Sequence, residues 1–581
     1  MTATTPVADT TSQYDGERTA AQLWRHVLAH APAAPAYLEE TPSGWRPVEW
    51  AETADRVAAL ANGLLARGVR RGDAVAVLAR TRLEWVLLDW ATMSIGAVVV
   101  GLYPTNSAKE CAYILAHSEA VLAFAEDAEQ EAKLAEVRGE TSLRDVVRFD
   151  ELPALEDEGG AYASEHPGAL DEAARELAAD DLATLIYTSG TTGPPKGCML
   201  THRNLVTAAV RVTNTLQDEQ DTILLFLPLA HSFGRLAHQA AAFHGTTVAL
   251  VADAARVPEA MLAVRPTVLP AVPRVYEKVH ANALGEIERA GGARTAIGRW
   301  ALGVGAKASR LRRAGRPVPP LLALENRIAD LLVFAKVRAR LGGRLRIGIS
   351  GAAPLSPDVM EFFHALGVPV IEGYGLTETS SSTTVNDPED FRIGTVGRVV
   401  EGTEVKLAED GEILVKSATV FAGYYKDPEA TAATFTEDGW FRTGDVGEID
   451  DDGFVKITDR KKDLIITAGG KNIAPQNLEN ALKSSRFVSQ AIVIGDRRPY
   501  VTALITLDDA EVAASGRDPQ QLVQELVDEV NRDRVRVEQI KRWTILPRDF
   551  SQEEGEVTPT LKLRRRVIHD HFADEIERLY A

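Results

Sequence analysis

The sequence predicts an α/β protein with a large N-terminal domain of doubly wound sheets, a small β-barrel subdomain and a smaller α+β C-terminal domain. Three observations predict it. Helical and strand patterns alternate up to about residue 395, short strands with Asp-Gly turns follow, and a final unit mixes strands with an amphipathic helix. A chain of 581 residues also exceeds the roughly 100 to 200 residues of one domain. We therefore expect at least two units with a large buried core.

The alternation starts with a helical face that ends at Gly68. Its apolar residues recur at i, i+3, i+4, i+7 and i+8: Val57, Leu60, Ala61, Leu64 and Leu65. We predict a strand at 74–78, a buried helix and strand within 85–102, a helix at 112–117, and strands at 120–125, 182–187 and 368–372. The last two strands each end in a Gly-rich turn. Such alternation is typical of a doubly wound sheet, which binds ligands beyond the ends of its strands.

The later part of the chain predicts two smaller units. Strands at 412–416 and 453–458, with Asp-Gly turns, indicate the β subdomain. Beyond the polar run 459–463, the strands predicted at 490–495 and 501–507 accompany a helix whose apolar face holds Leu522, Leu526, Val527 and Val530. We therefore predict an N-terminal domain over 1–458, a hinge over 459–463 and a C-terminal domain over 464–581.

The composition argues against several classes of protein. A content of 45% hydrophobic and 25% charged residues is that of a globular protein. The net charge of −19 repels a phosphate backbone, so we expect no nucleic-acid partner. Only Cys111 and Cys198 are present, which predicts neither a disulfide framework nor a zinc site and fits a reducing cytoplasm. The first 14 residues have no basic or apolar segment, so we expect a flexible tail rather than a signal peptide.

A loop rich in glycine and hydroxyl side chains follows the predicted strand 182–187. It reads Tyr187-Thr-Ser-Gly-Thr-Thr-Gly-Pro-Pro-Lys-Gly197. Glycines let backbone N–H groups approach an anion, hydroxyls donate hydrogen bonds or bind a metal, and Lys196 adds a positive charge. The spacing differs from that of a P-loop, because its first two glycines are too close together and Gly197 follows the lysine. We interpret the segment as another kind of phosphate-binding loop, with a flexible surface loop as the alternative.

With this loop the chain resembles the adenylate-forming, acyl-activating superfamily, which includes acyl-CoA synthetases, peptide-synthetase adenylation domains and luciferases. The resemblance extends from about residue 20 to the C-terminus, with the motifs in the family's order. It implies an ATP site between a large N-terminal domain, which binds AMP and the acyl group, and a small mobile C-terminal domain. In the loop it implies contacts to ATP from Thr188, Ser189, Gly190, Thr191, Thr192 and Lys196.

A second matching motif is Glu372-Gly-Tyr-Gly-Leu-Thr-Glu378. The resemblance implies that Tyr374 stacks on adenine and that Glu378 and the Thr188 hydroxyl hold Mg²⁺ against the triphosphate. A hard cation suits both oxygen ligands, whereas a helix cap is the alternative role for Glu378. The implied nucleotide site also includes Glu372, Gly373, Gly375 and Thr377, and Gly351 and Ala352 from the turn 350–354. That turn is equally a plain strand-to-helix connection.

Two further motifs complete the resemblance. Asp445, at the end of Gly439-Trp-Phe-Arg-Thr-Gly-Asp445, is similar to the family aspartate that accepts both ribose hydroxyls, and Arg460 assists at the ribose or phosphate. Lys562 matches the lysine that acts in adenylation, so the implied catalytic residues are Lys562, Thr188 and Glu378. Leu561 stands where the commonest family pattern has glycine, as it does in long-chain acyl-CoA synthetases.

The resemblance implies two half-reactions. The acid attacks the α-phosphorus of ATP to give acyl-AMP, and the C-terminal domain then rotates about the hinge with Lys462 as pivot. This rotation removes Lys562 and presents Gly469 and Gly470 beside a channel for the thiol of coenzyme A. His231, in the matching segment 227–235, is implied to line the acyl pocket without transferring a proton. A buried core histidine is the alternative.

The segment from 270 to about 346 resembles long-chain synthetases. Within it, an apolar helical stripe is formed by Leu321, Leu324, Ile328, Leu331, Leu332 and Val337, among many lysines and arginines. A basic, amphipathic surface can touch anionic lipid, where a fatty acid resides. Peripheral membrane contact and ordinary helix packing with a charged outer face both stay open.

We therefore expect a long-chain fatty-acid–CoA ligase that uses ATP, coenzyme A and Mg²⁺. One alternative is a fatty acyl-AMP ligase that loads an acyl carrier protein; such relatives tend to carry an insertion for which 379–439 is too short. Another is a non-catalytic acyl or nucleotide sensor, which we expect to lose Glu378, Asp445 or Lys562. Luciferase-type oxygenation shares these motifs, although the long-chain segment argues against it. The oligomeric state stays open.

Overall fold

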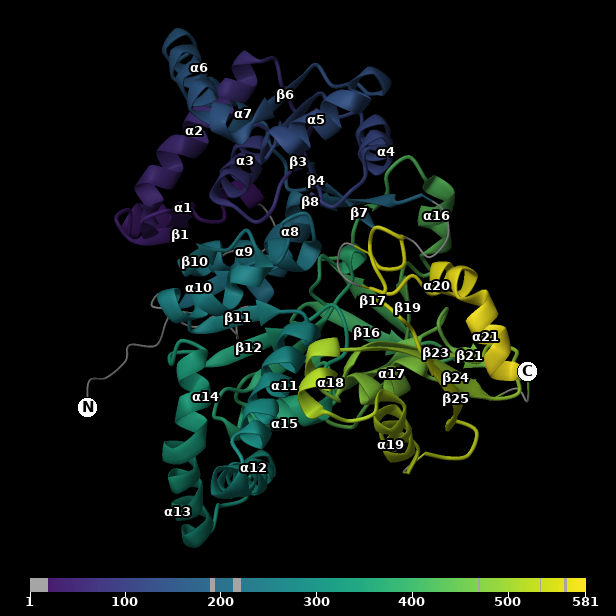
Figure 1. The fold of residues 1–581 in the computed structure, drawn as a ribbon. Coiled ribbons are helices and arrows are strands. Elements are labelled where there is room, and N and C mark those ends of the chain that lie inside the picture. Colours follow the sequence, from purple (N-terminus) through teal and green to yellow (C-terminus); the bar gives the residue numbers. More distant parts are fainter. Residues whose placement is uncertain (1–18, 189–193, 213–220, 469–470, 533, 559–561) are drawn as a thin grey trace.

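The computed structural model describes residues 19–188, 194–212, 221–468, 471–532, 534–558 and 562–581. Two large sheets with helices on their faces form the first part of the chain, and a β subdomain and a C-terminal unit lie to one side (Figure 1). The expected fold class is confirmed.

The larger sheet has nine strands in the order β15-β14-β13-β12-β11-β9-β10-β1-β2. Its central strands from β13 to β1 are parallel, and antiparallel strands close both edges. The strands are β1 (Pro35–Thr41), β2 (Gly44–Glu49), β9 (Thr222–Leu225), β10 (Thr247–Leu250), β11 (Val268–Ala271), β12 (Ile347–Ser350), β13 (Val370–Tyr374), β14 (Thr384–Val385) and β15 (Arg398–Val399).

The second sheet has seven strands in the order β18-β8-β7-β4-β3-β5-β6; β8 is antiparallel to both of its neighbours, and the other pairs are parallel. The strands are β3 (Ala74–Leu78), β4 (Val98–Leu102), β5 (Leu122–Ala125), β6 (Asp145–Arg148), β7 (Leu182–Thr188), β8 (Lys196–Thr201) and β18 (Gly423–Tyr424). Consecutive strands lie on opposite sides of β3, as the predicted doubly wound pattern requires.

Helices cover the two sheets and fill the space between them (Figure 1). They are α1 (Arg25–His30), α2 (Trp50–Ala66), α3 (Leu83–Ser94), α4 (Ala108–Ser118), α5 (Ala128–Val137), α6 (Leu152–Glu165), α7 (Ala169–Arg175), α8 (His202–Arg211), α9 (Ser232–His244), α10 (Val257–Val264), α11 (Pro273–Arg289), α12 (Gly292–Arg313), α13 (Pro320–Ala329), α14 (Ala335–Arg340) and α15 (Pro357–Ala365). Short helices are η2 (Ala20–Gln22), η3 (Arg138–Glu140), η4 (Phe149–Glu151), η6 (Ala254–Arg256), η7 (Asp330–Phe334) and η8 (Thr377–Thr379).

Local chemistry sets the element ends. Helix α4 begins at Ala108, earlier than the apolar pattern predicts, because Ser107 and Glu110 form a reciprocal capping box. Helix α2 ends just before Gly68, which takes a positive φ of 75° as predicted for a helix stop.

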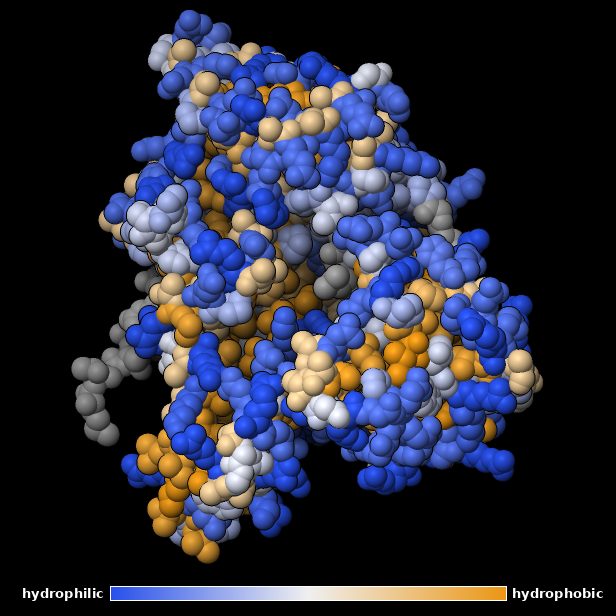
Figure 2. Space-filling view, in the orientation of Figure 1, coloured by the Kyte–Doolittle hydropathy of each residue, from blue (hydrophilic) through white to orange (hydrophobic). Residues whose placement is uncertain are grey.

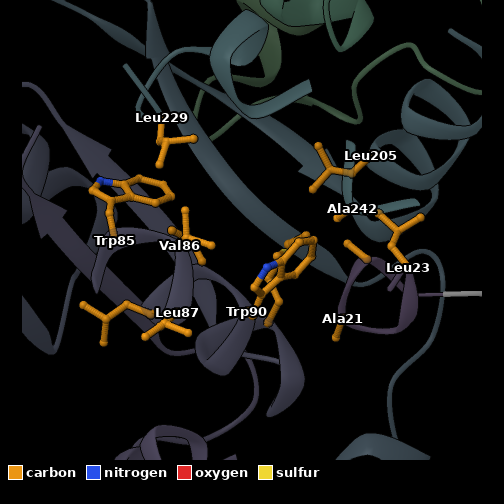
Figure 3. Close-up of a cluster of buried hydrophobic side chains, with 14 of the residues drawn as sticks. Ala21, Leu23, Trp85, Val86, Leu87, Trp90, Leu205, Leu229 and Ala242 are labelled. Atoms are coloured by element: carbon orange, nitrogen blue, oxygen red, sulfur yellow. The ribbon is translucent and has the colours of Figure 1, made fainter. Parts of the chain in front are cut away.

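One hydrophobic cluster joins the two sheets. Trp85 and Trp90 of α3 are fully buried; Trp85 lies near Leu229, whereas Trp90 lies toward Leu205 of α8 and Ala242 of α9 (Figure 3). The indole N–H of Trp90 donates to the hydroxyl of Tyr37 on the other sheet at 3.1 Å. The segment 85–102 is therefore a buried helix and strand, as the sequence predicts.

The β subdomain is a four-stranded antiparallel sheet, β16 (Thr403–Leu407), β17 (Glu412–Ser417), β19 (Phe441–Ile449) and β20 (Val455–Arg460), with α16 (Pro428–Ala433) between β17 and β19 in the chain. The first two residues of the predicted hinge, Asp459 and Arg460, belong to β20, because the ladder with β19 continues to the pair Asp445 and Arg460. Asp459 is only 1% exposed, so the polar run is not solvated throughout.

The C-terminal unit packs around two hydrophobic clusters of its own. A three-stranded sheet, β23 (Val488–Ile494), β24 (Val501–Leu507) and β25 (Ile540–Ile545), accompanies the pair β21 (Ile465–Ile466) and β22 (Asn472–Ile473). Its helices are α17 (Pro475–Lys483), α18 (Asp509–Ser515), α19 (Pro519–Arg532), α20 (Arg565–His571) and α21 (Ala573–Tyr580). The apolar face predicted for α19 packs against the core of this unit through Leu526, Val527 and Val530.

Cys111 and Cys198 are both free and buried. Among the described residues, no helix combines the length and apolarity needed to cross a membrane.

Candidate active site

A cleft of about 2750 Å³ opens where the strand ends of both sheets meet the β subdomain and the C-terminal unit. Thr188 ends β7, the turn 351–354 follows β12, and Tyr374 ends β13, so strand ends from both sheets bring the predicted residues to this cleft. Sites for single small molecules usually enclose about 300 to 1000 Å³. The cleft therefore has room for several ligand groups at once.

Asp445 is buried in the cleft wall between two partners. The hydroxyl of Tyr374 donates to one carboxylate oxygen at 2.7 Å, and Arg460 Nε lies 3.2 Å from the other. Burial raises the pKa of the Asp445 carboxyl, while Arg460 opposes the rise. The sequence predicted Tyr374, Asp445 and Arg460 from separate motifs, and the fold brings all three together.

Lys562 enters the same cleft from the C-terminal unit. Burial, reinforced by the nearby Arg460 cation, lowers the pKa of the Lys562 amine to about 8, while Asp445 and Glu378 oppose the shift. Two backbone contacts with Thr558 hold its position, since the Lys562 N–H donates to the Thr558 hydroxyl at 3.0 Å and its carbonyl accepts at 2.8 Å. The amine is thus placed among one guanidinium and two carboxylates.

Glu378 and Lys196 share a tyrosine that the sequence analysis missed. The Tyr424 hydroxyl donates to Glu378 Oε1 at 2.8 Å, and Lys196 Nζ lies 5.0 Å from the centre of the Tyr424 ring. Lys196 also pairs with Asp427 at 3.2 Å. Tyr424 reaches this place because β18 pairs with β8, and no local motif around it signals this partnership.

Thr188 and Glu378 both line the cleft. The Thr188 hydroxyl lies 3.9 Å from the Cys198 thiol, and Glu378 accepts the Tyr424 hydroxyl through one of its two carboxylate oxygens. Within the described part of the chain, no group of three His, Cys, Asp or Glu side chains could hold a metal ion alone. One carboxylate and one hydroxyl fit Mg²⁺, which keeps several waters and binds substrate phosphates.

The turn after β12 carries backbone strain. Ala352 has a φ of 72°, a left-handed conformation that is costly for a residue with a side chain. A Cβ on the preceding Gly351 would lie 3.2 Å from the Phe233 ring. The adjacent Glu372 is buried and accepts from the Leu355 N–H at 2.7 Å, and burial raises its pKa to about 8. Glu372 therefore stays largely protonated and fixes this turn.

The turn after β13 leaves no space for side chains. A Cβ on Gly375 would lie 2.3 Å from a backbone atom of Ser381, so only glycine fits. Thr377 is buried beside Ser232, whose hydroxyl lies 3.3 Å from that of Thr377 and accepts from Ser381 at 2.6 Å. Sequence analysis missed Ser232 and Ser381, although Ser232 directly follows His231 in a matching segment.

His231 caps helix α9, where its Nδ1 accepts from the Phe233 N–H at 3.1 Å. It lines the cleft, and burial together with the nearby Lys562 lowers its pKa to about 3. A neutral imidazole used as a cap agrees with the expectation that it transfers no proton.

The remaining predicted residues fall into two groups. Gly373 and Lys462 line the cleft, and Lys462 is exposed at its rim. Ser189, Gly190, Thr191, Thr192, Gly469 and Gly470 lie outside the described residues.

Comparison with protein families gives two matches that span most of the chain. The model of the AMP-binding enzyme family matches residues 24–425, and that of the AMP-binding enzyme C-terminal domain matches residues 462–581.

Curated relatives match over nearly the whole length. The chain is 40% identical over 561 residues to the long-chain-fatty-acid–CoA ligase FadD15 of Mycobacterium bovis, which covers 92% of each protein. It is 31% identical over 594 residues to the long-chain-fatty-acid–CoA ligase ACSBG2 of Xenopus laevis, covering 92% of this chain and 80% of that protein.

A solved structure shares the fold. The adenylation domain of a carboxylate reductase from Mycobacterium chelonae superposes with a TM-score of 0.77 at 25% identity, over 99% of this chain and 93% of that one.

Proposed function

The chain belongs to the AMP-binding enzyme family, and from that premise we propose that it is a long-chain fatty-acid–CoA ligase. The 40% identity over 92% of the chain to a ligase of that name carries the assignment. The reaction has two steps. A carboxylate oxygen of the acid attacks the α-phosphorus of ATP and releases pyrophosphate; the thiolate of coenzyme A then attacks the acyl carbon of the adenylate and releases AMP.

For the first step we assign Lys562 the main catalytic role. Acid and ATP are both anionic, so charge builds up on the α-phosphate oxygens as they react. The Asp445 and Glu378 carboxylates both stabilise the charged form of the Lys562 amine. A cation placed in this buried position stabilises the transition state without reorganising solvent.

Asp445 is proposed to bind the ribose. Its carboxylate is held from both sides by Tyr374 and Arg460, so it is pre-oriented to accept two hydroxyls. The strained turn at Gly351 and Ala352 and the tight turn at Gly375 form the walls of the proposed adenosine pocket. Lys196 is proposed to bind phosphate together with its loop, after giving up its pairing with Asp427.

Thr188 and Glu378 are the proposed ligands of Mg²⁺. The bound ion would neutralise triphosphate charge and orient the leaving pyrophosphate. The hydrogen bond from Tyr424 orients Glu378 for this purpose.

We also propose that the second step uses another orientation of the C-terminal unit. Lys562 lines the cleft in the present arrangement, and Gly469 and Gly470 are the proposed wall of the thiol channel. The separate hydrophobic clusters of this unit support its movement as a body about residues 459–463.

The test is single-turnover mass spectrometry with ATP, Mg²⁺ and palmitate, with and without coenzyme A. We expect palmitoyl-AMP to form and to become palmitoyl-CoA when the thiol is added. An adenylate that persists with coenzyme A but disappears with an acyl carrier protein would reassign the chain to the carrier-loading class. No adenylate with any chain length would overturn the assignment to an enzyme.

A further inference from the structure

One helical segment presents an apolar stripe to solvent. Residues 320–340 form a continuous helix from α13 through the π-helical η7 to α14. The exposed fractions are 70% for Leu321, 57% for Leu324, 41% for Ile328, 69% for Leu331 and 44% for Leu332. At helical spacing these five side chains, the exposed stripe, fall within an arc about 100° wide. Figure 2 shows this apolar cluster at the projecting end where Figure 1 places α13.

The exposed stripe is not the face that holds the helix in place. Ala329 and Phe334 point inward and are buried, and Phe334 packs so closely on α12 that a Cβ on Gly305 would lie 2.7 Å from its ring. Val337, predicted to belong to the stripe, instead packs on the core cluster with this inner face. The outer leucines could therefore be polar without loss of the packing that holds the helix.

Cations surround the exposed stripe. Residues 291–340 contain eleven lysines and arginines and only two acidic residues, in a chain of net charge −19. Several of these arginines pair with carboxylates, but within the described part of the chain Arg316, Arg327 and Lys336 are exposed and form no ion pair. At helical spacing Arg327 and Lys336 flank the stripe on opposite sides.

We propose that this surface docks on an anionic lipid bilayer. An apolar face flanked by lysine and arginine is the pattern of a helix that lies in the membrane interface, with its leucines among the acyl chains and its cations at the headgroups. A second copy of the chain fits less well, because a two-fold contact through this stripe would bring two strongly basic segments face to face.

The proposal rests on the proposed function in one respect. A long-chain fatty acid partitions into bilayers, so an enzyme that docks there meets its substrate at high local concentration. The exposed stripe belongs to the helix and not to the cleft lining, so docking and chemistry can be tested separately.

The experiment is sedimentation of the full chain with phosphatidylcholine vesicles, with and without phosphatidylglycerol. One variant removes apolar contacts (Leu324→Ser, Ile328→Ser, Leu331→Ser), and another removes charge (Arg316→Gln, Arg327→Gln, Lys336→Gln). The matched control, Val535→Ser with Val537→Ser, changes side chains that are 61% and 47% exposed elsewhere on the molecule.

We expect the unsubstituted protein and the control to bind anionic vesicles and to release them in high salt. Each cation near an anionic surface strengthens binding about fivefold, so the charge variant should bind on the order of a hundredfold more weakly. The apolar variant should also lose binding. Equal binding by all four proteins, or no binding by the unsubstituted protein, would overturn the proposal.

Two further readouts separate the alternatives. Formation of acyl-CoA from palmitate supplied on albumin, without vesicles, should be equal in all four proteins; its absence in all of them alongside vesicle binding would reject the proposed function and leave the docking surface intact. Light scattering measures mass in solution. If the unsubstituted protein and the control are dimers and the apolar and charge variants are monomers, the surface binds a second copy of the chain. That result would overturn the membrane proposal.

Discussion

At the level of single side chains, the cleft sets one amine among two carboxylates and one guanidinium. Burial and Arg460 both disfavour the charged form of Lys562, whereas Asp445 and Glu378 favour it, and the balance lowers its pKa to about 8. A lysine with this pKa is mostly a cation at pH 7 and loses its charge within the range in which enzymes are commonly assayed. Its titration is therefore measurable.

We predict an alkaline limit on adenylation. If the cation form of Lys562 is required, kcat/KM for ATP should fall about tenfold per pH unit above a pKa near 8, because this ratio reports the free enzyme. Lys562→Arg should lower the maximal kcat/KM for ATP but move the pH at which this ratio falls to a higher value, since the guanidinium stays charged. The measurement is the pH profile of pyrophosphate release in single turnovers.

The control for this prediction is Lys541→Met, which removes an exposed lysine of β25 that does not line the cleft. It should leave the profile unchanged. An alkaline limit that stays near pH 8 in Lys562→Arg would assign the titration to another group.

At the level of elements, charged contacts join the C-terminal unit to the N-terminal part. Glu511 of α18 pairs with Arg289 of α11 at 3.1 Å and with Arg486 of its own unit at 3.4 Å. Arg289 and Arg486 thus converge on one carboxylate across the boundary. This contact belongs to the arrangement in which Lys562 occupies the cleft, and a rotation of the unit would break it.

We predict that Glu511→Gln slows acyl-AMP formation and not thioester formation. A partly exposed ion pair contributes up to about 1 kcal/mol, so the first step should slow by a few fold at most. Rapid-quench measurement of each half-reaction, the second started from acyl-AMP, would show the difference. The control is Glu525→Gln, whose carboxylate pairs with Arg517 within the same unit. Equal slowing of both half-reactions by Glu511→Gln would contradict the inference that Glu511 stabilises this orientation of the C-terminal unit.

At the level of the whole molecule, the core that joins the two sheets contains a buried ion pair. Asp89 of α3 binds Arg235 of α9, and both side chains are almost fully buried. Arg235 also donates to the Thr184 hydroxyl of β7 and lies over the Trp85 ring. Burial raises the pKa of the Asp89 carboxyl, with Arg235 opposing the rise.

We predict that Arg235→Met destabilises the protein by about 3 to 5 kcal/mol, because it leaves a buried carboxylate unpaired. The raised pKa of Asp89 should rise further in this variant. The native state then holds a proton that the unfolded state loses, so its stability should fall as pH rises above about 4. Urea unfolding followed by tryptophan fluorescence at pH 5 and pH 8 measures both effects.

The control here is Arg46→Met, which removes an exposed arginine paired with Glu39 and Glu52. It should cost no more than about 1 kcal/mol. If Arg235→Met lowers the free energy of unfolding by as little as the control does, the buried pair contributes little to stability.

The sequence alone determined the fold class, because the apolar pattern of each of these helices and strands lies within a short stretch of the chain. The face from Val57 to Leu65 became α2, the strand predicted at 74–78 became β3, and the strands at 412–416 and 501–507 appear as β17 and β24. The motif residues Tyr374, Asp445 and Lys562 were also found from sequence, because each stands in a local string that resembles a known family. The alternation of polar and apolar residues depends only on residues near one another in the chain, so it can be read directly from the sequence.

Only the tertiary structure decided which groups face one another. Tyr424 became a partner of Glu378 through the pairing of β18 with β8, and Ser381 met Ser232 through a turn that only Gly375 allows. The pattern of the apolar helix near residue 330 also allowed burial of all its leucines, but the fold buried Phe334 and packed Val337 partly buried against the core, leaving Leu321 and Leu331 in solvent. Contacts between residues distant in the chain depend on how whole elements pack, and periodicity within one element does not encode its partner.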